Sequence, residues 1–151
     1  MKIDVVELQI CTKYSIEISS ENFDGYIYGA KTAAEIFSSE LGSSNVERIG
    51  VLFLDNTYRV INYSNIAIGS VKDVKMPIAE LFKIALLSNA SRFFIAHNHP
   101  SGVLEITEPD IELTKKIGSI AKLFDMELMD SIIVSFNGEA VSIREHLKEL
   151  V

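Results

Sequence analysis

Residues 92–110 read RFFIAHNHPSGVLEITEPD, and this stretch decides the fold. Its apolar start, Phe93 to Ala96, is short and aromatic enough to predict a buried strand. Pro100 and Gly102 then force a turn, and a helical pattern begins at the far end of the stretch. In open α/β sheets, sites usually form where strands end and helices begin. We therefore expect three side chains to converge there: His97, His99 and Asp110.

The alternation of His97 and His99 indicates a metal site. On a continuing strand both side chains would lie on one face, about 7 Å apart. With modest bending, their ring nitrogens can reach one ion at about 2.0–2.1 Å, and Asp110 can be the third ligand. Three protein ligands plus a water are typical of a catalytic zinc, and the single cysteine of the chain excludes a closed cysteine cluster.

A second interpretation explains the same residues without a metal. Thr107 suits the N-cap of a helix whose first turn contains Pro109. Asp110 would then be the acid of a capping box, and the two histidines would be turn residues only. Spacing alone leaves both interpretations open, and we expect Asp110 to serve only one of the two roles well.

A family resemblance favours the metal. His97-x-His99, followed by seven residues, Thr107, two residues and Asp110, resembles the metal motif of the JAMM (MPN+/JAB) metallopeptidase superfamily. The wording of residues 96–102, AHNHPSG, is similar to the bacterial RadC branch. Residues 47–55, ERIGVLFLD, match the E-x-x-x-V-L-x-L-D pattern of that branch. The likeness extends from about Tyr26 to about Ile143.

The resemblance implies an α/β fold, a three-layer αβα sandwich with a mixed β-sheet, in a layout related to cytidine deaminases. It implies a Zn²⁺ cofactor held by His97, His99 and Asp110, with water as the fourth ligand. Glu47 would take a proton from this water and pass it to the leaving amine. Thr107 replaces the usual serine and keeps a hydroxyl able to hydrogen-bond an oxyanion. The implied reaction is hydrolysis of a peptide or isopeptide bond.

Two departures and two alternatives accompany this resemblance. Ile78 stands where an arginine often follows the equivalent of Pro77, and Ser131 stands where relatives commonly have a histidine. Because a helix-hairpin-helix region like that of longer RadC proteins has no room here, we expect residues 1–151 to form a single domain. RadC proteins were named for DNA repair, so an accessory protein or nuclease acting on DNA is one alternative. A non-catalytic MPN scaffold is the other.

Composition narrows the choice of partners. A chain of 151 residues with 48% hydrophobic content predicts one domain with a substantial core. The formal net charge of −7 disfavours a broad DNA-binding surface, and the resemblance implies a peptide or protein substrate. The start is too acidic for a signal peptide, and no 18-residue apolar stretch follows, so we expect a cytoplasmic protein without a membrane partner. Nothing in the sequence indicates an oligomeric state.

Periodicity and turn residues predict the remaining elements. Cys11 is expected to be buried within the first strand, and His146 to be a surface residue of the last helix. The linker 69–76 is expected to be irregular. The predicted strands are Val5–Ile18, Glu47–Leu54, Tyr58–Ile68, Glu127–Phe136 and Glu139–Ser142, with hairpin turns at Asp55-Asn56 and Asn137-Gly138. Four helices are predicted. The first begins at a Thr32–Glu35 capping box and ends at Gly42, and the others cover Pro77–Ala90, Pro109–Phe124 and the residues from Ser142 onward.

Overall fold

The computed structural model describes residues 1–19, 23–69 and 76–149. Its helices are α1 (Ala30–Leu41), α2 (Ile78–Leu87), α3 (Glu108–Leu123) and α4 (Ile143–Glu149). Its strands are β1 (Glu47–Leu54), β2 (Val60–Gly69), β3 (Arg92–Asn98), β4 (Glu127–Val134) and β5 (Ala140–Ser142). None of the described helices is both long and apolar enough to cross a membrane.

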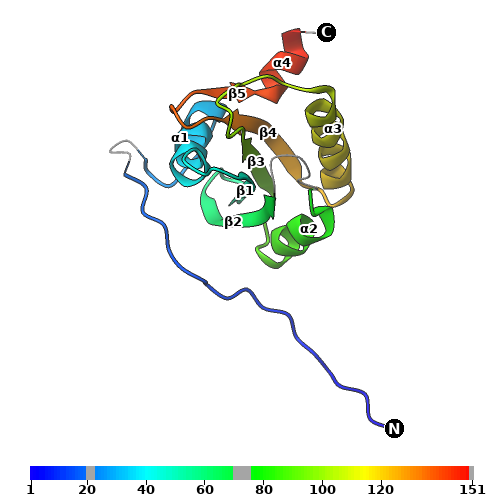
Figure 1. The fold of residues 1–151 in the computed structure, drawn as a ribbon. Coiled ribbons are helices and arrows are strands. Elements are labelled where there is room, and N and C mark those ends of the chain that lie inside the picture. The colour runs from blue at the N-terminus through cyan, green and yellow to red at the C-terminus, as the bar shows by residue number, and fades with distance from the viewer. Residues whose placement is uncertain (20–22, 70–75, 150–151) are drawn as a thin grey trace.

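The five strands form one mixed sheet in the order β2-β1-β3-β4-β5. β3 and β4 are parallel, whereas β1 pairs antiparallel with both β2 and β3, and β5 pairs antiparallel with β4. Helix α1 covers one face of this sheet, and α2 and α3 cover the other (Figure 1). The predicted three-layer αβα sandwich with a mixed sheet is therefore confirmed.

Both faces of the central strands are buried, which explains their nearly continuous apolar sequences. In β1 and β3, alternate side chains enter two separate cores. The core beneath α2 and α3 contains Val51, Phe53, Phe93 and Ile95. The core beneath α1 contains Leu52, Leu54, Phe94 and Ala96. Because successive strand residues point to opposite faces, these core residues also determine on which side of the sheet every other β3 side chain lies.

Both predicted hairpins are confirmed, and local turn chemistry accounts for each. Between β1 and β2, the Asp55 carboxylate accepts hydrogen bonds from the backbone N–H groups of Thr57 at 2.8 Å and Arg59 at 3.1 Å. Between β4 and β5, Gly138 adopts a φ of 82°, which a residue with a side chain rarely adopts. These turns set the registers of the two strand pairs at the edges of the sheet.

Helices α2 and α3 are confirmed, and each has an exposed apolar side chain near its carboxyl end. Leu86 is 46% exposed and Phe124 is 44% exposed. Each lies at a helix end, where the chain turns away through a residue with positive φ, namely Asn89 at 54° and Asp125 at 56°. Helix α2 also ends at Leu87, short of the predicted Ala90. Of the linker expected to be irregular, residues 70–75 lie outside the described residues.

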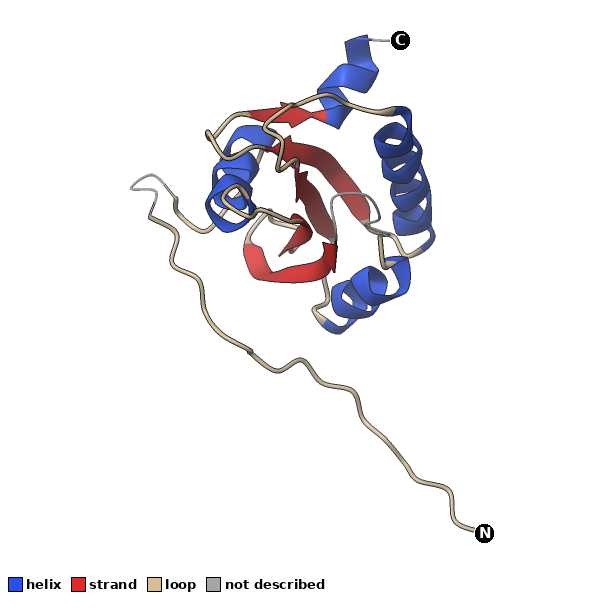
Figure 2. Ribbon diagram, viewed as in Figure 1, coloured by secondary structure: helices blue, strands red, loops and turns tan. Residues whose placement is uncertain are grey.

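The predicted first strand is wrong. Residues 1–19 form neither helix nor strand and run as an extended tail away from the sandwich (Figures 1 and 2). Val6 and Leu8 are each 78% exposed, and Cys11 is an exposed free thiol rather than a buried one. An alternating pattern fits a strand only where another strand is available to pair with it, and this segment has no such partner in the described part of the chain. Two contacts join the tail to the sandwich: the Tyr14 hydroxyl accepts a hydrogen bond from Asn65 of β2 at 3.2 Å, and Ile18 packs against the core beneath α1.

The predicted capping box of α1 is also wrong. The helix begins at Ala30, its N-cap is Gly29, and Thr32 already lies within its first turn. The chain before the helix is fixed to the sheet edge, because the backbone N–H of Ile27 donates to the Tyr58 carbonyl at 2.9 Å. The helix begins three residues after Ile27, at Ala30, and therefore earlier than the predicted cap at Thr32. Its predicted end at Gly42 is confirmed.

Candidate metal centre

The candidate site forms where β1 begins, β3 ends and α3 begins. Because β1 and β3 are antiparallel with Ile49 opposite His97, the start of β1 lies beside the end of β3. Glu47 is two residues before Ile49 and therefore shares the face on which His97 lies. His99 follows directly after the end of β3. The sheet thus brings together residues that are about fifty positions apart in the chain.

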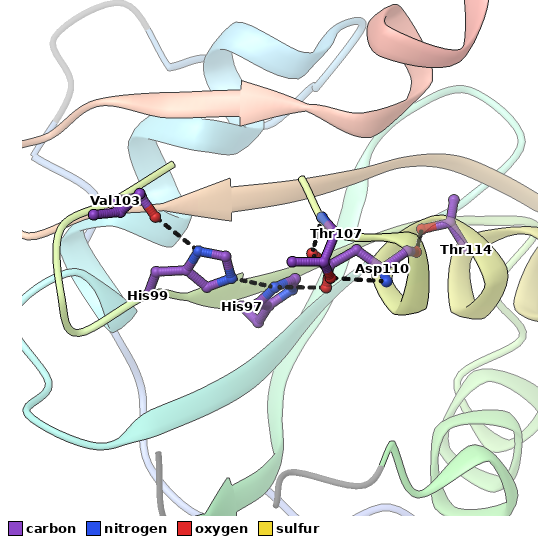
Figure 3. A network of polar contacts seen from close by, with 6 residues as sticks. All are labelled: His97, His99, Val103, Thr107, Asp110 and Thr114. Carbon is purple, nitrogen blue, oxygen red and sulfur yellow. Dashed lines mark hydrogen bonds and ion pairs between the residues drawn. The ribbon is translucent and has the colours of Figure 1, made fainter. Parts of the chain in front are cut away.

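The ligand atoms of three predicted residues converge. His97 Nε2 lies 3.1 Å from His99 Nε2 and 3.3 Å from Asp110 Oδ1, as Figure 3 shows. In a tetrahedral zinc site with bonds of about 2.0–2.1 Å, neighbouring donor atoms lie about 3.3 Å apart. The group of residues whose ligand atoms all lie within 4.8 Å of one another consists of Glu47, His97 and His99, whereas Asp110 faces His97 from outside this group.

The ring of His99 is oriented for metal binding. Its Nδ1 lies 2.8 Å from the carbonyl oxygen of Val103 (Figure 3). Because a carbonyl can only accept, Nδ1 must carry the hydrogen, which leaves the lone pair of a neutral ring on Nε2. A backbone carbonyl in this role commonly fixes the tautomer of a metal-binding histidine. The sequence did not reveal this contact, since a backbone carbonyl has no signature in the residue types.

Asp110 forms the predicted capping box of α3 with one carboxylate oxygen and faces His97 with the other. Its Oδ2 accepts hydrogen bonds from the Thr107 backbone N–H at 2.9 Å and from the Thr107 hydroxyl at 2.8 Å. Its own backbone N–H donates to Thr107 Oγ1 at 3.4 Å, which completes the capping box of α3. Oδ1 faces His97 instead. The capping role of Asp110 is therefore confirmed, and its role as a metal ligand, for which Oδ1 is left available, stays a prediction.

The side chain of Thr107 contacts Asp110. Its hydroxyl hydrogen is donated to Asp110 Oδ2, so in this structure the side chain holds the carboxylate in place. The role of Thr107 as a donor to an oxyanion stays a prediction. His146 lies in α4, is half-buried, and does not belong to the group of possible ligands among the described residues.

The donor set fits a cation. His97 Nε2 faces both the free Nε2 of His99 and the Asp110 carboxylate, and the side chains of His97 and Asp110 are little exposed, at 12% and 15%. Burial alone would raise the pKa of Asp110, but the hydrogen bonds and charge of His97, together with Thr107, lower this pKa to about 2. Such a convergence of electron-rich atoms is stabilised by a positive charge between them, and histidine with carboxylate is a ligand set that zinc accepts.

This lowered pKa predicts an acid-dependent loss of stability in the metal-free protein. A pKa of about 2 in the folded state, against 3.8 as the ordinary value, means that ionised Asp110 stabilises the fold at pH values above 3.8. That contribution, at most about 2 kcal/mol, is lost as the pH falls toward 2. Urea unfolding of wild type and Asp110→Asn should differ most near neutral pH and converge in acid. Glu108→Gln removes a charge from the same helical turn and should show no such trend; a constant difference for Asp110→Asn would contradict the prediction.

The immediate surroundings are tightly packed. A cavity of about 10 Å³, roughly the size of one water, lies among Ile95, His97, Asp110 and the buried Ser131. Two larger hollows, of about 290 and 570 Å³, lie against α1 on the opposite side of the sheet and contain neither histidine.

Comparison with known proteins agrees with these observations. The sequence model described as RadC-like JAB domain matches residues 27–149. A protein named UPF0758 from Finegoldia magna is 33% identical over 138 residues, covering 91% of this chain and 60% of its own length. Another UPF0758 protein, from Acidithiobacillus ferrooxidans, is 39% identical over 99 residues, covering 66% of this chain and 44% of its own length. The chain thus spans about half the length of the curated relatives it matches.

Proposed function

Because the chain belongs to the RadC-like JAB domain family, we propose that it is a zinc-dependent hydrolase of the JAMM type that cleaves a peptide or isopeptide bond. The observation that supports this proposal best is the position of His97 Nε2, which lies 3.1 Å from His99 Nε2 and 3.3 Å from Asp110 Oδ1. A second carboxylate, that of Glu47, lies within 4.8 Å of the nitrogens of both histidines. Two imidazoles and two carboxylates at one strand end match the needs of metal-assisted hydrolysis.

The proposed roles divide the cluster into ligands and a base. His97, His99 and Asp110 would hold the zinc, with the Val103 carbonyl and Thr107 fixing the orientations of His99 and Asp110. When bound, zinc would make water nucleophilic at neutral pH by lowering its pKa to about 7. Glu47 would accept the proton from the attacking water on its carboxylate and return it to the nitrogen of the leaving amine. During attack, Thr107 would turn its hydroxyl hydrogen from Asp110 Oδ2 to the carbonyl oxygen of the substrate, while its backbone N–H would continue to hold Asp110.

Zinc content is the first test of this proposal. Elemental analysis of the untagged protein, after zinc is added back and excess is removed, should find about one zinc per chain. Asp110→Ala should lose it, because two histidines alone leave the ion without its third ligand. Glu108→Ala is the matched control, since it removes a neighbouring exposed acid of the same helical turn and should retain the metal. Absence of zinc from the wild type would leave Asp110 as a helix cap and favour a scaffold function.

No observation favours the DNA-directed alternative. The net charge of −7 opposes binding to a phosphate backbone. Support for a DNA-directed function would require measured binding to DNA that weakens steeply as the salt concentration rises. The UPF0758 relatives carry no activity in their names. The peptidase proposal therefore rests on the cluster and on family membership.

A further inference from the structure

Asn98 lies between the two histidines in sequence, but it belongs to the other face of β3. Its neighbours Phe94 and Ala96 on the same face pack into the core beneath α1. The side chain of Asn98 is fully buried, at 0% exposure. A buried primary amide without partners would be costly, so its hydrogen bonds indicate what it does.

The Asn98 amide binds the backbone on both sides of Glu47. Its Oδ1 accepts a hydrogen bond from the backbone N–H of Arg48 at 2.7 Å. Its Nδ2 donates to the carbonyl of Val46 at 3.0 Å and to that of Ser44 at 3.3 Å. One side chain thus holds both the residue before Glu47 and the residue after it.

These bonds replace backbone pairing at the point where it ends. The ladder between β1 and β3 runs from Leu54 opposite Arg92 to Ile49 opposite His97. The next step would set Arg48 opposite Asn98, and there the side-chain oxygen takes the Arg48 N–H instead. On its other edge β1 remains paired with β2 as far as Glu47. Asn98 therefore fixes the position of Glu47 relative to the strand that bears the histidines.

We propose that Asn98 is a positioning residue that sets the Glu47 carboxylate against His97 and His99. Asn98 stands between His97 and His99 in the chain, and its side chain is hydrogen-bonded to the backbone of both neighbours of Glu47. It therefore fixes the backbone of Glu47 relative to the backbone of the two histidines. The inference rests on the proposed function, since it assigns to Glu47 the task of accepting a proton. Asn98 itself lies on the far face of the strand and acts only through Glu47.

Binding of acetohydroxamic acid to the zinc-loaded protein tests this role without a known substrate. A hydroxamic acid loses its O–H proton when its oxygens ligate zinc, and a carboxylate within hydrogen-bond reach accepts that proton. Its affinity, measured by calorimetry, therefore reports where the Glu47 carboxylate lies. Zinc content is determined in parallel, so loss of metal and loss of positioning are separated.

Three variants give the comparison. Asn98→Ala should retain about one zinc and bind acetohydroxamic acid about 10- to 100-fold more weakly, as is usual for residues that orient a metal site indirectly. Glu47→Gln should weaken binding at least as much. Asn62→Ala is the matched control: Asn62 also makes a tertiary hydrogen bond, to Ser88 at 2.9 Å, but it lies away from the histidines. Its affinity should stay within about twofold of wild type.

A double variant shows whether the effect passes through Glu47. In the Glu47→Gln background, Asn98→Ala should cause less than about a twofold further loss, because the group that it positions is already disabled. If Asn98→Ala folds poorly, Asn98→Ser leaves a polar group that is too short to reach both Arg48 and Val46, and the same weakening is expected.

The outcomes separate the two proposals. A wild type without zinc, or with an affinity for acetohydroxamic acid that Glu47→Gln leaves unchanged, would overturn the proposed function and the inference with it. If Glu47→Gln weakens binding but Asn98→Ala behaves like Asn62→Ala, the inference alone is wrong. Equal losses from Asn98→Ala with and without Glu47 would also overturn it.

Discussion

Glu47→Gln is expected to retain about one zinc per chain and to lose about 10²- to 10⁴-fold in the rate of peptide-bond hydrolysis, the usual contribution of a general base. Glutamine preserves the length and hydrogen-bonding shape of the side chain but cannot accept a proton at neutral pH. The ligands His97, His99 and Asp110 are unchanged, so metal binding should persist. Cleavage of a complex peptide library, followed by mass spectrometry, identifies a substrate on which the two rates are then measured.

This variant also decides between two roles for Glu47. Its carboxylate lies within 4.8 Å of the nitrogens of His97 and His99, close enough for a ligand as well as for a base. Loss of zinc from Glu47→Gln would make it a ligand, and an undiminished rate would exclude it as the base. Glu80→Gln, at an exposed position of α2, is the control and should retain both zinc and activity.

Phe93→Ala is expected to reduce the free energy of unfolding by about 3–5 kcal/mol, a large part of the roughly 5–15 kcal/mol available to a domain. Phe93 is fully buried in the central strand β3. Its ring lies 6.3 Å from that of Phe53 and 6.0 Å, edge to face, from that of Phe82. Truncation would leave a cavity where β1, β3 and α2 meet, and equilibrium unfolding in urea measures the loss.

An exposed phenylalanine provides the control for this measurement. Phe136 is 66% exposed just after β4, so Phe136→Ala should change the stability by no more than about 0.5 kcal/mol. Equal losses for the two variants would show that burial of Phe93 is not what stabilises the sheet. The lower stability of Phe93→Ala should also weaken zinc binding at high temperature, since His97 follows four residues later on the same strand.

Elements with local signals could be predicted from the sequence. The bounds of β1 are those expected, and both hairpins form at Asp55-Asn56 and Asn137-Gly138, where turn residues act over a few positions. The strand expected at Val5–Ile18 does not form, because its alternation specifies a face but no pairing partner. The start of α1 was misplaced for a similar reason, since pairing of Ile27 at the sheet edge overrides the local signal at Thr32.

The residues of the candidate site also fall into those that the sequence could predict and those that it could not. Motif spacing identified His97, His99 and Asp110, and family resemblance added Glu47, which the antiparallel pairing of β1 with β3 brings to the histidines. Which oxygen of Asp110 faces His97 depends on how α3 packs against the sheet, and no linear pattern contains that information. Asn98 was missed, although its place between two residues of the opposite face could have marked it as a buried polar side chain.

The two oxygens of Asp110 couple the site to the helix that follows it. One oxygen receives the first hydrogen bonds of α3, and the other faces His97. A cation beside His97 would hold the carboxylate in the orientation in which its other oxygen caps the helix, while fraying of that first turn would release the ligand. By thermodynamic reciprocity, the free energy that the cation adds to the helix equals the free energy that the intact helix adds to cation binding.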